Sequence, residues 1–156
     1  MAAAPLDLVV VGGGPAGIST ALHVLDASPG LASRMVVLEK ASYPRDKYCA
    51  GAIGGRGLRV LERIGVRVDV PSVVINAISL RAAGRTLVLR EPEMGVVVRR
   101  IQFDESLAQE AMRRGVEVRQ GAAVEHVEPA GAGARTAGRV RVVLASGEVL
   151  EARAVV

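Results

Sequence analysis

The feature that most constrains the fold is a glycine-rich turn placed between an apolar segment and an amphipathic segment. Residues 6–11 are mostly apolar and rich in valine, which is typical of a strand buried in a parallel sheet. Residues 15–27 then place apolar side chains every three or four positions, the period of a helix that packs on one face. A second apolar run follows at residues 35–39. This order of strand, turn, helix and strand predicts one βαβ unit and hence a parallel sheet.

The turn itself, residues 12–17, has the sequence GGGPAG and fits the pattern G-x-G-x-x-G. In this pattern Gly12 permits the tight turn, Gly14 lets a pyrophosphate approach the backbone, and Gly17 lets the helix pack close to the strand. Free N–H groups at the start of the helix add a partial positive charge that favours an anion. The alternative is an ordinary glycine-rich turn without a ligand. The residues predicted to bind the phosphates are Gly12, Gly14, Pro15, Ala16 and Gly17.

An acidic residue strengthens the nucleotide interpretation. Glu39 ends the second strand, 22 residues after Gly17, where dinucleotide-binding folds place a carboxylate that accepts hydrogen bonds from ribose hydroxyls. A carboxylate at this place also repels the 2′-phosphate of NADP. A solvent-exposed glutamate at a strand end is the alternative, but the complete order of strand, turn, helix, strand and acid favours a bound dinucleotide.

The remainder of the chain contains further helices and strands. Residues 40–54 have no period and are predicted to form a long loop, which in compact domains is often functional. An acidic turn at residues 91–93 and a Gly/Ala loop at residues 129–137 are also expected. Helices are predicted at residues 55–64 and 102–114, and strands at residues 73–81, 85–90, 96–99, 116–119, 123–127, 139–144 and 149–155. This order predicts an α/β domain with a central parallel sheet and a β-meander.

Composition excludes several classes of protein. With 156 residues, of which 50% are hydrophobic, the chain has room for about one domain with a buried core. The net charge is +4, but 18 arginines are scattered among 16 acidic residues with only three aromatic residues, so nucleic acid is not expected as a partner. One cysteine excludes a disulfide scaffold. Neither a transmembrane stretch nor a secretory signal is recognisable, so we expect a cytoplasmic protein.

Three stretches resemble one family of flavoproteins. Residues 9–17, VVVGGGPAG, together with LEK at residues 38–40, are similar to the FAD-binding start of the two-dinucleotide-binding flavoproteins. Residues 43–51, YPRDKYCAG, resemble the P-R-x-K-x-C-G-G stretch of the geranylgeranyl reductases, with Ala50 in place of a glycine. Residues 100–107, RIQFDESL, match the family pattern R-x-x-F-D-x-x-L. Group A flavin monooxygenases and flavin-dependent halogenases share this architecture.

The resemblance implies an FAD-dependent oxidoreductase. Residues 1–156 would form a Rossmann-like FAD-binding domain, in which residues 72–99 are a hairpin and strand insertion that begins a β-rich substrate domain. In the family, NAD(P)H reduces the flavin, which then reduces an isoprenoid or another apolar, lipid-like substrate. Peripheral contact of the protein with a membrane is compatible with such a substrate. The family continues past a strand like residues 152–156, so the chain is expected to be a fragment. A flavin monooxygenase or halogenase, and a non-catalytic nucleotide-binding module or inactive gene fragment, are the alternatives.

The same resemblance implies further contacts to the cofactor. Arg100 would pair with phosphate oxygens, for which the planar guanidinium group is suited. Arg45 and Lys47 would meet either phosphates or flavin oxygens, and a surface charge is the alternative for each of the three residues. Cys49 would lie near the flavin ring, and a small buried hydrophobe is its alternative. His23 and His126 have no partners at ligand spacing, so neither a metal site nor a catalytic set is predicted. The further residues predicted to bind the cofactor are Glu39, Lys40, Cys49, Ala50, Gly51 and Val124.

Overall fold

The computed structural model describes residues 6–129 and 138–156. Six strands form the main sheet: β1 (Leu6–Val11), β2 (Met35–Glu39), β6 (Glu117–Gln120), β7 (Val124–Glu128), β8 (Val140–Leu144) and β9 (Val149–Val155). Their order is β6-β2-β1-β9-β8-β7. The neighbours from β6 to β9 are parallel, whereas β7, β8 and β9 form an antiparallel meander. The predicted parallel sheet and meander are confirmed, and the predicted loop at 129–137 lies almost wholly outside the described residues.

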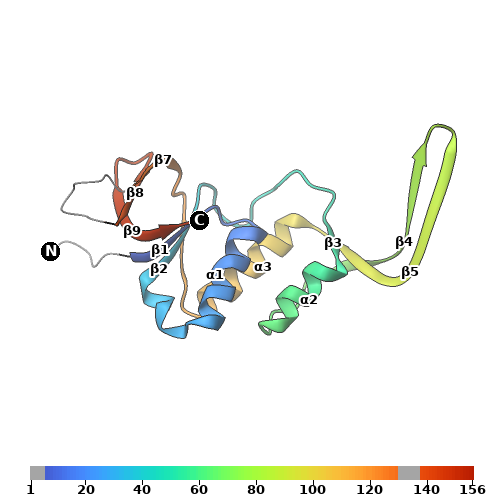
Figure 1. The fold of residues 1–156 in the computed structure, drawn as a ribbon, viewed down its shortest axis with the longest axis horizontal. Helices are drawn as coiled ribbons and strands as arrows, with labels where there is room; N and C mark the ends of the chain where they lie inside the picture. Colours follow the sequence, from blue (N-terminus) through green and yellow to red (C-terminus); the bar gives the residue numbers. More distant parts are fainter. Residues whose placement is uncertain (1–5, 130–137) are drawn as a thin grey trace.

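Helices cover one face of this sheet (Figure 1). α1 (Pro15–Ala27) joins β1 to β2 through a short 3-10 helix, η1 (Pro29–Arg34), and α3 (Arg100–Arg113) packs beside α1. α2 (Gly55–Arg63) follows the loop after β2. The predicted βαβ unit is confirmed with the bounds expected for its two strands and its helix. The 3-10 helix was not expected, and it begins at Pro29, whose fixed φ suits a first helical position.

The core lies on both faces of the parallel strands, as expected for a sheet that is covered twice. All five residues of β2 are buried, and the four apolar ones alternate between two clusters. Met35 and Val37 pack with the helices, whereas Val36 and Leu38 pack with residues of the meander, including Val142. Full burial of such a side chain contributes about 1.5–3 kcal/mol. The carboxyl ends of β1 and β2 are therefore held from both sides.

A second, smaller sheet has the order β3-β5-β4 and is antiparallel. Its strands are β3 (Ala52–Gly54), β4 (Ser72–Ala82) and β5 (Arg85–Val98). β3 lies within the segment predicted to be a loop, because three residues carry too little periodicity to indicate a strand.

The predicted turn at residues 91–93 is wrong, because β5 passes through it without reversing. Glu93 adopts a φ of 55°, and its N–H donates a hydrogen bond of 2.9 Å to the side chain of Asn76 on β4. The register between the two strands shifts between Ile75 and Ala77. A β-bulge of this kind keeps the chain in the sheet while it bends. The two acidic residues therefore mark a bend in one strand rather than a connection between two.

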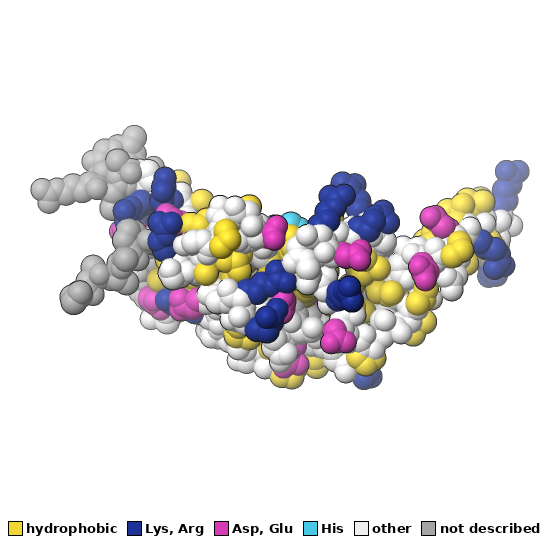
Figure 2. All heavy atoms as spheres, turned by 90° about the horizontal axis from the view of Figure 1, so that it is seen from below, with side chains coloured by type: hydrophobic (Ala, Val, Ile, Leu, Met, Phe, Trp, Pro, Cys, Tyr) yellow, Lys and Arg dark blue, Asp and Glu magenta, His cyan; other side chains and the backbone are white. Residues whose placement is uncertain are grey.

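The outer half of the β4–β5 hairpin projects from the body as an arm (Figure 1). Ile78 lies opposite Leu89, and Leu80 lies opposite Leu87, so four apolar side chains share one face of the arm. These side chains are 42–54% exposed. Figure 2 shows hydrophobic side chains along this projecting end of the molecule. A two-stranded hairpin without a second layer is only marginally stable in water.

We therefore expect the arm to open far more often than the core. Amides of residues 77–90 should exchange with deuterium much faster than those of β2, because exchange from the arm needs only local opening. Exchange read by mass spectrometry on proteolytic peptides provides the measurement. Equally slow exchange in the two segments would show that the arm has a stabilising layer in solution.

Candidate functional site

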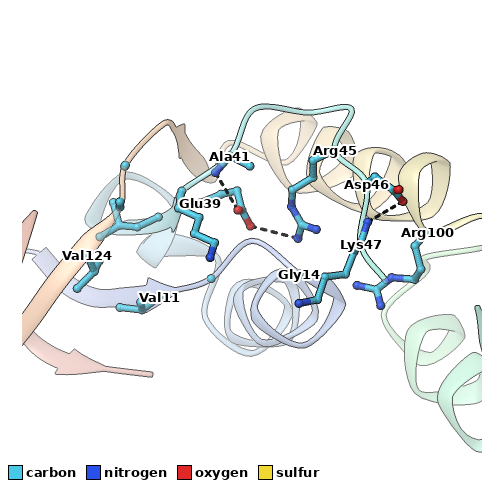
Figure 3. A pocket seen from close by; sticks show the side chains of 14 residues that line it. Val11, Gly14, Glu39, Ala41, Arg45, Asp46, Lys47, Arg100 and Val124 are labelled. Atoms are coloured by element: carbon cyan, nitrogen blue, oxygen red, sulfur yellow. Dashed lines mark hydrogen bonds and ion pairs between the residues drawn. The ribbon is translucent and has the colours of Figure 1, made fainter. Parts of the chain in front are cut away.

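A hollow of about 410 Å³ lies at the carboxyl ends of β1 and β2. The chain passes from β1 into α1 here, and β2 and β9 flank β1 on opposite sides, so the strand order reverses at this point. Ligands of open parallel sheets bind at such points. The hollow is lined by Val11, Gly12, Gly14, Leu38, Glu39, Lys40, Ala41, Arg45, Asp46, Lys47, Arg100, Ala122, Ala123 and Val124 (Figure 3).

Each glycine of the turn would respond differently to an added side chain. Gly12 has a φ of +109°, which L side chains rarely adopt. A Cβ on Gly17 would overlap the carbonyl oxygen of Gly12, so α1 approaches the strand as predicted. A Cβ on Gly14 would meet only the Arg45 guanidinium, at 3.6 Å, which leaves this backbone open to a ligand. Gly13 was not predicted to matter, yet a Cβ there would overlap the hydroxyl of Tyr43.

The first turn of α1 offers its backbone donors to the hollow. Gly14 is the N-cap residue of the helix, and it has no side chain that could accept a hydrogen bond from the first turn. Pro15 occupies the first helical position and carries no N–H itself. No acidic side chain lies in the first turn. The positive end of this thirteen-residue helix is therefore left for an anion.

Glu39 is buried and links the glycine turn to the loop after β2. Its carboxylate accepts hydrogen bonds of 3.0 Å from the N–H groups of Gly13 and Ala41, and it forms an ion pair of 3.1 Å with Arg45. A carboxylate offers about four acceptor positions. Three are used by the chain itself, so one remains for a ribose hydroxyl. The position predicted for Glu39 therefore fits a nucleotide.

Tyr43 closes the back of the turn. Its hydroxyl donates a hydrogen bond to the carbonyl oxygen of Gly13. The guanidinium carbon of Arg45 lies over its ring, 5.5 Å from the ring centroid. Burial and the negative charge of Glu39 raise the pKa of Tyr43 to about 12. The phenol therefore stays protonated and acts as a donor across the physiological range of pH.

Asp104 on α3 joins the two arginines of the site. It is fully buried and accepts two hydrogen bonds from Arg100, of 2.6 and 2.8 Å, in the paired geometry that guanidinium and carboxylate groups favour. It also pairs with Arg45 at 3.1 Å. The sequence analysis did not single out Asp104, although its spacing of four residues from Arg100 on a helix was a usable signal. Asp104 keeps the pKa of Arg100 above its ordinary value.

A second hollow, of about 740 Å³, lies on the other side of Arg100. Arg100 lines both hollows. The second hollow also includes Pro15 and Ala16 from the start of α1 and Cys49 and Gly51 from the long loop. Apolar side chains from α2 and α3 complete its walls. The two hollows therefore meet at the N-terminus of α1.

The loop beside the second hollow depends on Gly51 rather than on Ala50. Gly51 has a φ of +76°, and a Cβ there would overlap the carbonyl oxygen of Val98. Ala50 has no positive φ, so the alanine that replaces the family glycine is accommodated without strain. Cys49 is exposed, contrary to the alternative of a buried hydrophobe. The pKa of its thiol lies below the ordinary value because the sulfur accepts a hydrogen bond from Gly51 N–H and because Arg100 stabilises the thiolate.

The structure thus brings most of the predicted residues to the two hollows. Those that line the first hollow are Gly12, Gly14, Glu39, Lys40, Arg45, Arg100 and Val124. Those that line the second are Pro15, Ala16, Cys49, Gly51 and Arg100. Gly17 and Ala50 line neither hollow, and Gly17 acts through packing.

The histidines lie away from these hollows. His23 is hydrogen-bonded to the carbonyl oxygen of Ser19 one helical turn earlier, at 2.7 Å, and His126 is paired with Glu128 at 3.0 Å on an exposed strand. Within residues 6–129 and 138–156, no three His, Cys, Asp or Glu side chains form a group that could hold a metal ion. In the same part of the chain, no helix is long and apolar enough to cross a membrane.

The chain belongs to the family described as lycopene cyclase protein, which matches residues 7–156. A curated relative that carries the name expected from the sequence is digeranylgeranylglycerophospholipid reductase 3 of Methanosphaera stadtmanae. It is 27% identical over 122 residues, which cover 72% of this chain and 29% of the relative. Conditioned medium factor receptor 1 of Dictyostelium discoideum is 26% identical over 136 residues, which cover 77% of this chain and 26% of the relative.

Among solved structures, the fold resembles that of the flavin-dependent halogenase CmlS. The TM-score is 0.76 at 20% identity, with 99% of this chain and 29% of the halogenase covered. The resemblance to geranylgeranyl reductases and to the architecture of flavin-dependent halogenases is therefore confirmed, and the lycopene cyclases are a family that the sequence analysis did not name. The chain spans between a quarter and a third of the length of these three proteins.

The different roles of Gly14 and Gly17 predict different effects of the same substitution. Gly17→Ala should destabilise the fold by at least about 2 kcal/mol, because its methyl group overlaps backbone that cannot move without shifting α1. Gly14→Ala should change stability by less than about 1 kcal/mol, because the methyl group makes only an ordinary van der Waals contact, at 3.6 Å, with the Arg45 guanidinium. Urea denaturation of the two variants and the parent is the measurement. Equal losses of stability would contradict the assigned geometry of the turn.

Proposed function

We propose that this chain binds FAD in an extended conformation across the two hollows. The adenosine part lies in the first hollow, the pyrophosphate lies at Gly14 and the start of α1, and the flavin ring points to the second hollow beside Cys49. The observation that carries the proposal is the meeting of the two hollows at Arg100 and at an uncapped helix N-terminus. In a dinucleotide the pyrophosphate lies between two ring systems. In this site the N-terminus of α1 and Arg100 likewise lie between the two hollows.

Each part of the site has a separate task in this proposal. Glu39 accepts a hydrogen bond from a ribose hydroxyl with its remaining acceptor position. Backbone N–H groups at the start of α1 donate to the pyrophosphate, and Arg45 and Arg100 supply positive charge beside it. Val124 and Val11 give the adenosine part an apolar wall. The chain thus binds and orients the cofactor, and the bound flavin supplies the redox chemistry.

We further propose that the protein is an oxidoreductase of the geranylgeranyl reductase type, in which NAD(P)H is the reductant and the substrate is an isoprenoid or similarly apolar molecule. Support comes from the loop at residues 43–51 and from a relative that is named a reductase. Residues 72–99 are, in this proposal, the beginning of the substrate domain. A flavin monooxygenase is the alternative, and turnover of NAD(P)H with and without uptake of oxygen distinguishes the two.

The site predicts that Gly14→Val abolishes binding of FAD without unfolding the chain. The branched side chain would occupy the backbone surface that the pyrophosphate needs, whereas within the fold its Cβ meets only the Arg45 guanidinium, at 3.6 Å. Absorbance near about 450 nm that stays with the protein through gel filtration measures retained flavin. Gly30→Val is the matched control, since Gly30 faces open space and lies in η1, away from the turn. A yellow Gly14→Val protein would place the anion elsewhere.

Alkylation of Cys49 tests the position of the flavin ring. Cys49 is the one cysteine of the sequence, it is exposed, and its lowered pKa favours the reactive thiolate. Saturating FAD should slow its reaction with iodoacetamide several-fold, whereas saturating ADP should leave the rate nearly unchanged, because ADP lacks the ring. Mass spectrometry at timed intervals gives the two rates. Equal rates with and without FAD would show that the flavin ring does not lie in the second hollow.

A further inference from the structure

We propose that Asp104 is a positioning residue that holds Arg45 and Arg100 at the phosphate-binding turn, so that binding of a pyrophosphate depends on a carboxylate that does not itself touch the ligand. This inference rests on the proposed function. It assigns to a buried side chain of α3 the task of orienting both positive groups of the site.

The burial of Asp104 shows that its contacts are internal. Its exposed fraction is 0%, and it is one of two charged residues buried among the described residues. The hydrogen bonds from Arg100 involve Nε and Nη2, and the ion pair with Arg45 involves Nη1. Both oxygens of the carboxylate are therefore engaged by guanidinium groups. Because Asp104 is fully buried and lines neither hollow, it has no direct contact with a ligand bound there.

The two arginines, by contrast, reach the surface of the first hollow. Arg45 comes from the loop after β2 and points to Glu39 (Figure 3), with one Nη only 3.6 Å from where a Cβ of Gly14 would lie. Arg100 starts α3 and lines both hollows. Asp104 lies between these groups and brings together two arginines, Arg45 on the loop and Arg100 on the helix, that are 55 positions apart in the sequence.

Charge explains why the carboxylate is needed. Two guanidinium groups at one site repel each other, and the repulsion is strong where water is excluded. Asp104 offsets this repulsion and fixes each group through directional hydrogen bonds. Arg45 Nε is buried and has no hydrogen-bond partner in the part of the chain that the structure describes. A buried donor without a partner is uncommon, and the ion pairs that fix the Arg45 guanidinium are those of its Nη atoms with Glu39 and Asp104.

Two other roles for Asp104 make different predictions. If Asp104 only joined α3 to the loop, its loss would weaken every ligand of the site in proportion to a general loss of order. If Asp104 competed with phosphate for the arginines, its loss would strengthen binding of a phosphate ligand. A positioning role predicts a selective loss for ligands that carry the pyrophosphate.

The experiment compares ADP with adenosine as probes of the full chain. Titrations followed by ¹H–¹⁵N NMR spectra give both dissociation constants, including weak ones. For Asp104→Asn, the affinity for ADP should fall about tenfold, the scale on which loss of an orienting partner acts, whereas the affinity for adenosine should stay within about twofold. Glu110→Gln is the matched control, because Glu110 also pairs with two arginines, at 2.6 and 2.7 Å, but its partners Arg113 and Arg114 line neither hollow.

The outcomes separate this inference from the function on which it rests. If the parent binds neither ADP nor FAD, the proposed function is wrong and the inference falls with it. If the parent binds ADP and Asp104→Asn binds it equally well or more tightly, only the inference is wrong. Equal losses for ADP and adenosine would make Asp104 merely structural. Should Asp104→Asn not fold, Asp104→Glu keeps the charge but displaces it by one methylene group, and unchanged affinity for ADP in that variant would also overturn the inference.

Discussion

The site depends on the close approach of α1 to β1, where the position of Gly17 against the carbonyl oxygen of Gly12 leaves no space for a side chain. This contact fixes the direction in which the helix leaves the strand. Because the strand is buried on both faces, the helix N-terminus is held at the carboxyl edge of the sheet. Backbone donors that would otherwise need a capping side chain are thereby presented to a ligand. Packing of apolar residues thus creates an electrostatic feature.

The opposite wall of the first hollow is built by charge rather than by packing. Glu39, Arg45, Asp104 and Arg100 form a continuous chain of contacts from the second strand to the start of α3. Through Arg45, this series of contacts fastens the long loop after β2, which has few apolar side chains of its own. Buried ion pairs contribute little net stability because desolvation offsets their attraction, but they specify which groups face one another. The arrangement of the loop therefore depends on the ion pairs of Arg45, a residue that also lines the first hollow.

The sequence was most informative where structure follows from local pattern. The bounds of β1, α1 and β2 follow from periodicity and glycine, and the tight turn expected at Gly12 and the close packing expected at Gly17 agree with the geometry. Contacts between distant segments were not predictable in this way. The pairing of Arg45 with Asp104 requires knowledge of how the loop lies over α3, and the bulge near Glu93 requires knowledge of the partner strand. A single sequence holds no direct signal for either contact.

Two sets of charged groups lie at the first hollow. One set would attract an anionic ligand through its net positive charge, and the other would only orient the ligand. The guanidinium groups of Arg45 and Arg100 and the carboxylates of Glu39 and Asp104 together carry no net charge. These four side chains therefore provide fixed positions for hydrogen bonding rather than a net positive potential. The remaining positive charge at the first hollow comes from Lys40, Lys47 and the positive end of α1, while Asp46 opposes it. The lysines carry long, flexible side chains and act as point charges, whereas the arginines are fixed by hydrogen bonds. The lysines and the helix N-terminus thus supply the net positive charge at the first hollow, whereas the arginines that pair with Asp104 supply hydrogen-bond donors in fixed positions.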